Sequence, residues 1–201
     1  MATTRILGIG GSPRKGGNSD ILLEHIVAGA RSAGATTDTI QLRDLAFQSC
    51  TGCERCRRDK RCTGLADEMA VVYEKLENSR GLVLISPVHS YTVTALMKAL
   101  LDRLYCYYDF GEQRPGPVAS RLAGQARKAV VAAVGEQATA EEGGMDTTMI
   151  ILRRNIEILG YEIIGELPVL GVFDRGAIDG HRQTLERAAQ LGRQLAAALN
   201  E

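Results

Sequence analysis

The chain has 201 residues, of which 45% are hydrophobic, and 24 Lys or Arg residues balance 24 Asp or Glu residues. This length suits one domain with a sizeable core, and the balanced charge argues against nucleic acid or an acidic membrane as a partner. No apolar run is long enough to span a bilayer, and no signal-peptide core precedes the first predicted strand. We therefore expect one cytoplasmic domain of residues 1–201, whose cysteines are ligands or reactive thiols rather than disulfides.

Apolar runs and helical spacing alternate along the chain. In chain order, we expect a strand at 6–9, a glycine-rich loop at 10–19, a helix from there to 33, a strand at 37–42, a cysteine-containing loop at 43–63, a helix at 65–78, a strand at 81–86, a helix at 94–107, a strand at 128–134, a helix at 144–159, a strand at 161–170 and a helix at 179–199. The third and fourth strands are nearly continuous apolar runs, as in a parallel sheet covered on both faces. The second strand alternates polar residues and should be more exposed.

Five strands in this order predict an α/β fold, a flavodoxin-like doubly wound five-stranded parallel sheet of strand order 2-1-3-4-5. The cysteine-rich loop (47–63) is inserted after strand 2. In such sheets, ligands bind outside the carboxyl ends of the strands, so the loops at 10–19, 87–92 and 135–144 are the expected binding edge.

The loop after the first strand has the groups that a phosphate needs. Its glycines let backbone N–H groups approach closely, Ser12 and Ser19 offer hydroxyls, and Arg14 and Lys15 offer charge. The helix that follows presents unpaired N–H groups, and Asn18 or Ser19 is expected to cap it. The loop is neither a P-loop nor a G-x-G-x-x-G fingerprint. The plainer alternative is an ordinary turn with a solvated basic loop.

Four of the five cysteines follow the spacing Cys50-x2-Cys53-x2-Cys56-x5-Cys62. Four thiols so close in sequence can surround one centre, as in the cysteine runs of ferredoxins. The sequence alone leaves three readings open: an iron–sulfur cluster, a zinc or redox-active thiol site, and free thiols. Cations around these cysteines would stabilise a negatively charged cluster or dock an acidic partner, and they are Arg55, Arg57, Arg58, Lys60 and Arg61. The fifth cysteine, Cys106, is expected to be a small core residue.

Two segments together resemble a known family. GSPRKGGNS after the first strand and SPVHSYTVTALMKALLDR after the third are similar to the NADPH-dependent FMN reductase-like branch of the flavodoxin-like flavoproteins. The cysteine spacing resembles the iron–sulfur flavoproteins, a subgroup that carries FMN and a [4Fe-4S] cluster. The resemblance covers residues 5–143 well and the last quarter only by fold order.

The resemblance implies one FMN in each subunit. It implies a phosphate site at Ser12, Arg14, Lys15, Gly17, Asn18 and Ser19. It implies that the isoalloxazine lies against Pro87, Val88, His89 and Ser90, and that Gly135, Glu136 and Gln137 close its other side. It also implies that the metal ligands are Cys50, Cys53, Cys56 and Cys62. His89 departs from the family, which often has an aromatic residue there, so it either alters stacking, supplies a proton or is a solvated turn residue.

Three functions follow as hypotheses. The first is an electron-transfer flavoprotein that passes electrons between FMN, a [4Fe-4S] cluster and a partner such as ferredoxin. The second is an NAD(P)H-dependent FMN or quinone reductase without a cluster, and the third is a non-enzymatic zinc-binding redox sensor. No protein acid or base is required by the first. The family resemblance also implies a homodimer or homotetramer.

Three smaller features complete the sequence predictions. Lys98 and Asp102 can pair at i, i+4 on a helix, either on the surface or in a subunit interface. The aromatic residues at 105–110 are either a core-to-loop transition or a wall over a neighbouring subunit's flavin. The segment 141–145 is expected to be a flexible loop, with a lid as its sharper interpretation.

Overall fold

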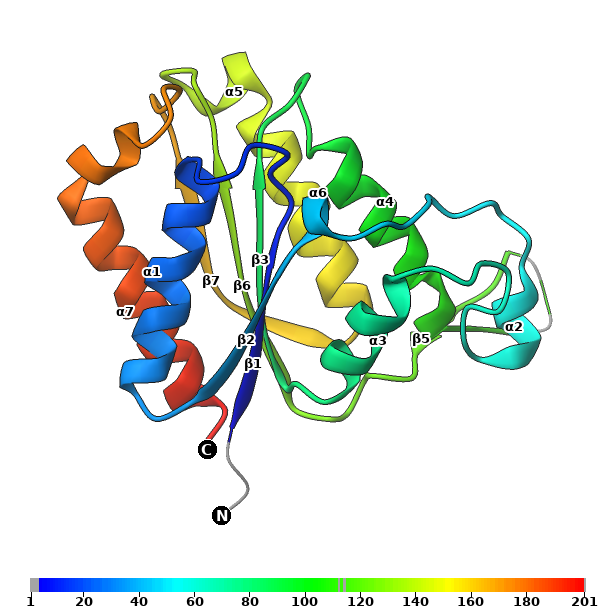
Figure 1. The fold of residues 1–201 in the computed structure, drawn as a ribbon. Coiled ribbons are helices and arrows are strands. Elements are labelled where there is room, and N and C mark those ends of the chain that lie inside the picture. The colour runs from blue at the N-terminus through cyan, green and yellow to red at the C-terminus, as the bar shows by residue number, and fades with distance from the viewer. Residues whose placement is uncertain (1–3, 112, 114, 201) are drawn as a thin grey trace.

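The computed structural model describes residues 4–111, 113 and 115–200, so the ends of the predicted domain 1–201 lie outside the described residues. Its centre is a five-stranded parallel sheet of order β2-β1-β3-β6-β7 (Figure 1). The strands are β1 (Arg5–Gly10), β2 (Thr36–Gln41), β3 (Gly81–Pro87), β6 (Arg127–Val134) and β7 (Tyr161–Val169). With β6 and β7 as the fourth and fifth strands of the sheet, this order confirms the predicted flavodoxin-like topology.

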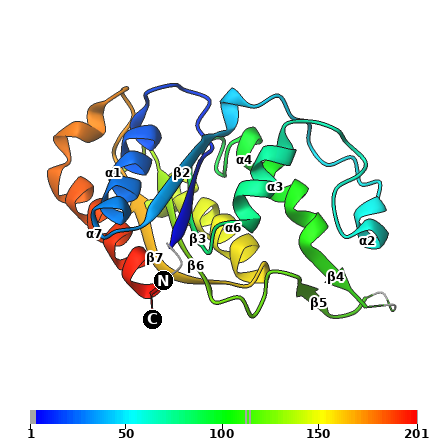
Figure 2. The same ribbon diagram turned by 60° about the horizontal axis from the view of Figure 1, so that its bottom comes forward.

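Helices cover both faces of the sheet (Figures 1 and 2). One face carries α1 (Asn18–Ser32) and α7 (Arg182–Ala198), and the other carries α3 (Met69–Glu77), α4 (Ala95–Arg103) and α6 (Met145–Ile158). Successive residues of β3 alternate between the two layers: Leu82 and Leu84 pack in the core beneath α3, α4 and α6, whereas Val83 and Ile85 pack beneath α1 and α7. This two-sided burial explains why the strand is an unbroken apolar run.

Short elements that lack a long periodic pattern were not predicted. They are α2 (Arg55–Asp59) inside the cysteine-rich loop, the antiparallel pair β4 (Tyr108–Phe110) and β5 (Val118–Ser120), α5 (Ala140–Gly143), and the 3-10 turns η1 (Leu42–Asp44), η2 (Leu104–Tyr107) and η3 (Ala177–Gly180). The segment expected to be a loop at 141–145 therefore contains α5 and the start of α6. The predicted helix 94–107 is α helix only to Arg103 and then tightens into η2.

The predicted helix at 65–78 begins only at Met69. The reason lies in the preceding carboxylate, because Asp67 accepts a hydrogen bond from the Gln48 backbone N–H at 3.0 Å and pairs with Arg103. These contacts tie Asp67 to Gln48 of the cysteine-rich loop and to Arg103 of α4, so residue 67 does not join the helix. Asp side chains commonly compete with helix hydrogen bonds in this way.

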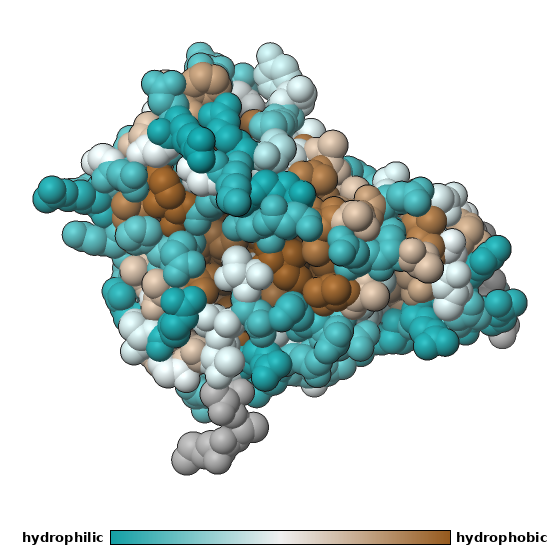
Figure 3. Space-filling view, in the orientation of Figure 1, coloured by the Kyte–Doolittle hydropathy of each residue, from teal (hydrophilic) through white to brown (hydrophobic). Residues whose placement is uncertain are grey.

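No helix in the described part of the chain is both long and apolar enough to cross a membrane. The face in Figure 3 is largely hydrophilic, with apolar side chains gathered near its middle. Strand β2 has one buried residue in six, which agrees with the prediction that this edge strand is the more exposed one.

Candidate functional site

The loops that follow β1, β3, β6 and β7 meet at the carboxyl edge of the sheet, at the top of Figure 1. Two adjoining cavities of about 130 and 220 Å³ lie among them, and both are lined by Val88 and Glu136. Of the predicted flavin contacts, the smaller cavity is lined by Ser12, Arg14, Gly17, Asn18, Ser19, Pro87, Val88, His89 and Glu136. The larger cavity is lined by Val88, Ser90, Gly135, Glu136 and Gln137.

Lys15 is the member of the predicted set that lines neither cavity, and it is exposed. The other members of that set come from three loops, at 12–19, 87–90 and 135–137, and the first and last of these are more than a hundred residues apart in the sequence. The structure therefore places the segments that the sequence analysis grouped around two adjoining cavities. The contact of each residue with a flavin stays a prediction.

The glycine-rich loop holds its polar groups beneath the surface at the start of α1. Ser12 and Ser19 are only 4% and 3% exposed, and the Arg14 backbone N–H donates to the Ser12 Oγ at 3.2 Å. No side chain caps α1, whose N-cap residue is Gly17. The first N–H groups of the helix are therefore left for a ligand, and the helix dipole favours an anion there.

The predicted capping role of Asn18 and Ser19 is wrong. The Asn18 side chain turns away from the helix end, donates to the Asp174 carbonyl at 2.9 Å and accepts from the Ile178 N–H at 3.3 Å. A loop 156 residues away in the sequence thus takes the polar atoms that local reasoning assigned to the helix.

That loop, which follows β7, was missed as part of the site. Phe173 is 55% exposed and lines the smaller cavity, and the Arg14 guanidinium stacks over its ring at 5.5 Å from the centroid. The Arg175 Nε donates to the Gly16 carbonyl at 3.2 Å. The rule that ligands bind at the carboxyl ends of the strands applies to the last strand too, and it was the signal that could have found this loop.

A second missed feature is an ion pair that fixes the glycine-rich loop. Arg43, just after β2, donates to both carboxylate oxygens of Asp20 at 2.9 and 2.8 Å and to the Ser12 carbonyl at 3.1 Å. Asp20 also accepts from the Gly16 backbone N–H at 2.7 Å. The pair neutralises a carboxylate in the first turn of α1, where it would otherwise repel an anion.

The loops after β3 and β6 are packed against each other. Ser90 and Tyr91 adopt positive φ angles of 47° and 67°, and His89 and Thr92 exchange backbone hydrogen bonds of 2.7 and 3.0 Å. Gly144, with a φ of 78°, leaves no room for a side chain, because a Cβ there would lie 2.4 Å from the Tyr91 backbone. Tyr91 is itself 70% exposed at the rim of the larger cavity.

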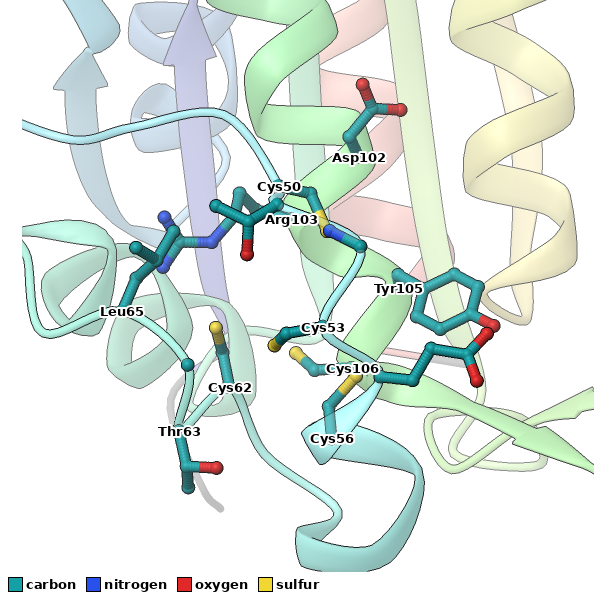
Figure 4. A pocket seen from close by; sticks show the side chains of 14 residues that line it. Cys50, Cys53, Cys56, Cys62, Thr63, Leu65, Asp102, Arg103, Tyr105 and Cys106 are labelled. Atoms are coloured by element: carbon teal, nitrogen blue, oxygen red, sulfur yellow. The ribbon is translucent and has the colours of Figure 1, made fainter.

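The cysteines line a separate cavity of about 330 Å³ beside α4, drawn in Figure 4. Its wall contains all four predicted ligands, Cys50, Cys53, Cys56 and Cys62, together with Cys106. Cys106 is 4% exposed, which places it in the core as predicted, yet it also contributes to this wall. Burial raises the pKa of the Cys106 thiol to about 12.

The thiols are close enough to influence one another. Burial raises the pKa of the Cys56 thiol, and the neighbouring Cys62, Cys50 and Cys53 raise it further. A side chain at position 64 would displace the Cys53 thiol from this arrangement, because a Cβ there would lie 2.5 Å from the Cys53 Sγ. Within residues 4–111, 113 and 115–200, no three His, Cys, Asp or Glu side chains are gathered tightly enough to hold a single metal ion.

The four motif cysteines in one cavity wall are a donor set that iron–sulfur clusters use. Four thiolates are also the ligands of structural zinc sites, so the donor set fits both groups. A buried ion pair fixes the start of the cysteine-rich loop against α4. Arg103 on α4 donates to the Asp67 carboxylate at 2.7 and 2.9 Å and to the Gln48 carbonyl at 2.8 Å. Arg103 holds the pKa of the Asp67 carboxyl below its usual range.

The cations of the cysteine-rich loop point elsewhere. Arg57 lies over the Phe110 ring at 4.6 Å, Arg58 pairs with Asp59 at 2.7 Å, and Lys60 pairs with Asp109. None of the loop's Lys or Arg side chains is among the described residues that line the thiol cavity. Arg55 is the exception, because a hydrogen bond from its backbone and its positive charge both lower the pKa of the Cys53 thiol. One predicted cation therefore lies close to a predicted ligand, and Arg57, Arg58 and Lys60 form an outward basic surface.

The aromatic residues at 105–110 divide between core and cavity. Tyr107 is buried and makes an edge contact with Tyr73 at 6.0 Å between ring centroids. Tyr105 lines the thiol cavity and packs against Phe110 at 4.9 Å. The predicted Lys98–Asp102 pair is present at 2.6 Å and exposed.

Comparison with known proteins extends these observations. The profile of the family described as NADPH-dependent FMN reductase matches residues 4–139. An iron–sulfur flavoprotein of Methanocaldococcus jannaschii is 29% identical over 81% of this chain and 76% of its own length. Five further curated relatives carry the name iron–sulfur flavoprotein as well.

Two solved structures share the fold. A flavone reductase superposes with a TM-score of 0.75 at 20% identity over 98% of this chain, which spans 64% of that longer protein. An NAD(P)H:quinone oxidoreductase from Methanothermobacter marburgensis superposes with a TM-score of 0.72 at 20% identity, over 96% of this chain and all of its own.

Proposed function

The chain belongs to the NADPH-dependent FMN reductase family and is a flavin-dependent oxidoreductase, and from that premise we propose that it transfers electrons between FMN and a [4Fe-4S] cluster. The two cavities at the carboxyl edge of the sheet take the flavin, and the thiol cavity takes the cluster. The observation that carries the proposal is the gathering of all four motif cysteines in one cavity wall, on a fold whose curated relatives are named iron–sulfur flavoproteins.

The phosphate of FMN fits the start of α1. Buried hydroxyls of Ser12 and Ser19, the Arg14 guanidinium and the uncapped N–H groups after Gly17 surround the smaller cavity. The Asp20–Arg43 pair keeps this end of the helix free of net negative charge. These residues bind and orient the cofactor, and Lys15 adds long-range attraction from the surface rather than a contact.

The flavin ring fits between the loops after β3 and β6. Pro87, Val88, His89 and Ser90 supply one side, and Gly135, Glu136 and Gln137 supply the other. When bound, FMN supplies the step between two-electron and one-electron chemistry, and the protein supplies its binding and surroundings. His89 is exposed at this edge, in a position to contact the ring.

The flavin and thiol cavities share no lining residue. We therefore propose a homodimer or homotetramer in which the thiol cavity of one subunit approaches the flavin edge of another. The outward cations of the cysteine-rich loop, with Arg58 and Lys60 at least half exposed, suit an acidic electron-carrier protein such as ferredoxin. Five described cysteines that form no disulfide suit the reducing cytoplasm.

A second function is direct reduction of FMN or a quinone by NAD(P)H without a cluster. The observation that favours it is the larger cavity, which lies open beside the exposed Tyr91 and could admit a nicotinamide donor. In that case the cysteines would be dispensable for turnover.

The two functions separate in a Cys53→Ala variant, compared with Cys106→Ala, which removes a thiol from the same cavity wall but outside the four-cysteine motif. Both are prepared anaerobically and assayed for iron, sulfide and flavin, and then for reduction by NADPH and by reduced ferredoxin. Electron transfer through the cluster predicts that Cys53→Ala loses iron and ferredoxin-driven reduction, whereas Cys106→Ala keeps both. Equal rates in wild type and Cys53→Ala with either donor would support the cluster-free reductase.

A further inference from the structure

A buried guanidinium lies in the wall of the thiol cavity. Of the described residues that line it, Arg103 alone carries a positive side chain, and Glu54 and Asp102 are the acidic ones. Asp102 is paired with Lys98 at 2.6 Å on the outer surface of α4. Figure 4 shows the Arg103 side chain extending from α4 toward Leu65, on the same cavity as Cys62.

The hydrogen bonds of Arg103 are nearly complete, with one exception. Its side chain is 1% exposed, and its two terminal nitrogens are used by the Asp67 carboxylate and the Gln48 carbonyl at 2.7–2.9 Å. The Nε is buried and has no hydrogen-bond partner within the described part of the chain. The Nε atoms of Arg43 and Arg121 are also buried without a partner, but of the three arginines only Arg103 lines the thiol cavity. Because buried polar groups are nearly always satisfied, a ligand in this cavity would supply the acceptor that this N–H lacks.

The chemistry of the cavity narrows what that acceptor is. Five cysteines line this cavity together with Arg103. A thiolate-ligated iron–sulfur cluster presents sulfur atoms that carry negative charge and accept hydrogen bonds. We propose that the Arg103 Nε donates a hydrogen bond to a sulfur of the bound cluster and thereby raises its reduction potential. This inference rests on the proposed function, because it requires the cluster.

The expected effect follows from charge. One electron, supplied by the flavin or by a donor such as ferredoxin, makes the cluster more negative, while Arg103 keeps its protons and no covalent bond changes. A donated hydrogen bond and a nearby positive charge stabilise the reduced state more than the oxidised one. Arg103 therefore favours reduction, and the bidentate pair with Asp67 holds its guanidinium in place.

The test compares midpoint potentials of the anaerobically reconstituted protein in an EPR-monitored redox titration. Arg103→Lys keeps the charge and a partner for Asp67 but has no Nε, and Arg57→Lys makes the same exchange outside the cavity. We expect Arg103→Lys to lower the equilibrium constant for reduction at least tenfold, which is about 59 mV for one electron, and Arg57→Lys to leave it unchanged. A potential in Arg103→Lys equal to that of wild type would overturn the inference.

A second measurement covers the case in which Arg103→Lys fails to fold or load. Wild-type protein is grown with arginine labelled with ¹⁵N in the guanidinium, and the reduced cluster is examined by pulsed EPR. A coupled guanidinium nitrogen supports the inference, and its absence contradicts it. Wild type that takes up no iron and sulfide would refute the cluster as well, whereas a loaded wild type without the coupling refutes only the role of Arg103.

Discussion

The Asp20–Arg43 pair offers the sharpest test of how the glycine-rich loop binds FMN. The two side chains are 14% and 12% exposed and joined by hydrogen bonds of 2.9 and 2.8 Å. Replacing Arg43 by Met removes these bonds and the one to the Ser12 carbonyl, and it leaves an uncompensated carboxylate in the first turn of α1. Hydrogen bonds to charged groups contribute about 1.5–3 kcal/mol each. If binding depends on one of them, the Kd for FMN rises roughly ten- to a hundredfold.

The assay is a titration of apoprotein with FMN, followed by quenching of flavin fluorescence. Lys75→Met is the matched control, because it breaks an ion pair outside the glycine-rich loop, the one between Lys75 and Asp38 at 2.7 Å. The Kd of this variant for FMN should stay within twofold of the wild-type value. Adding Asp20→Asn to Arg43→Met removes the stranded charge and should recover part of the affinity. A normal Kd in Arg43→Met, or no recovery in the double variant, would refute the electrostatic reasoning.

Three further predictions address the other parts of the account. Gly144→Ala places a side chain against the loop after β3 at a residue with positive φ, which costs at least about 1–2 kcal/mol. The melting temperature should therefore fall by several degrees. An unchanged melting temperature in calorimetry would contradict the packing of the two loops. Gly64→Ala pushes a Cβ against the Cys53 Sγ, so reconstituted protein should hold less iron per chain than wild type. Arg103 holds the pKa of the Asp67 carboxyl low. The stability that the carboxylate contributes is therefore present above its unfolded pKa of about 4 and is lost as the pH falls through the lower folded value. The free energies of unfolding in urea should differ between wild type and Asp67→Asn at pH 7 and converge at low pH.

The sheet could be predicted because strands that are buried on both faces have continuous apolar sequences. The run Gly81–Pro87 is apolar since its side chains alternate between two helical layers. Elements shorter than two turns, such as α2 with five residues, carry no such mark and were missed.

The site was predictable where it consists of contiguous loops and unpredictable where distant side chains complete it. Asn18 was expected to cap α1, but a loop 156 residues away binds its side chain instead. The Asp20–Arg43 and Asp67–Arg103 pairs join residues 23 and 36 positions apart. From the sequence around any one of these four residues, only an exposed surface charge would be predicted. Their burial and partners exist once the sheet has brought the loops together.

The central claim is that one chain binds both FMN and an iron–sulfur cluster. The measurement that tests it most directly is an anaerobic ultraviolet–visible spectrum of freshly purified protein, with iron, sulfide and zinc assayed on the same sample. A chain that holds both groups will show flavin bands on a broad iron–sulfur absorbance, with about four irons and four sulfides per chain as a [4Fe-4S] cluster requires. Flavin bands without iron or sulfide after reconstitution would contradict the cluster, and a spectrum without flavin would contradict the assignment of the glycine-rich loop itself.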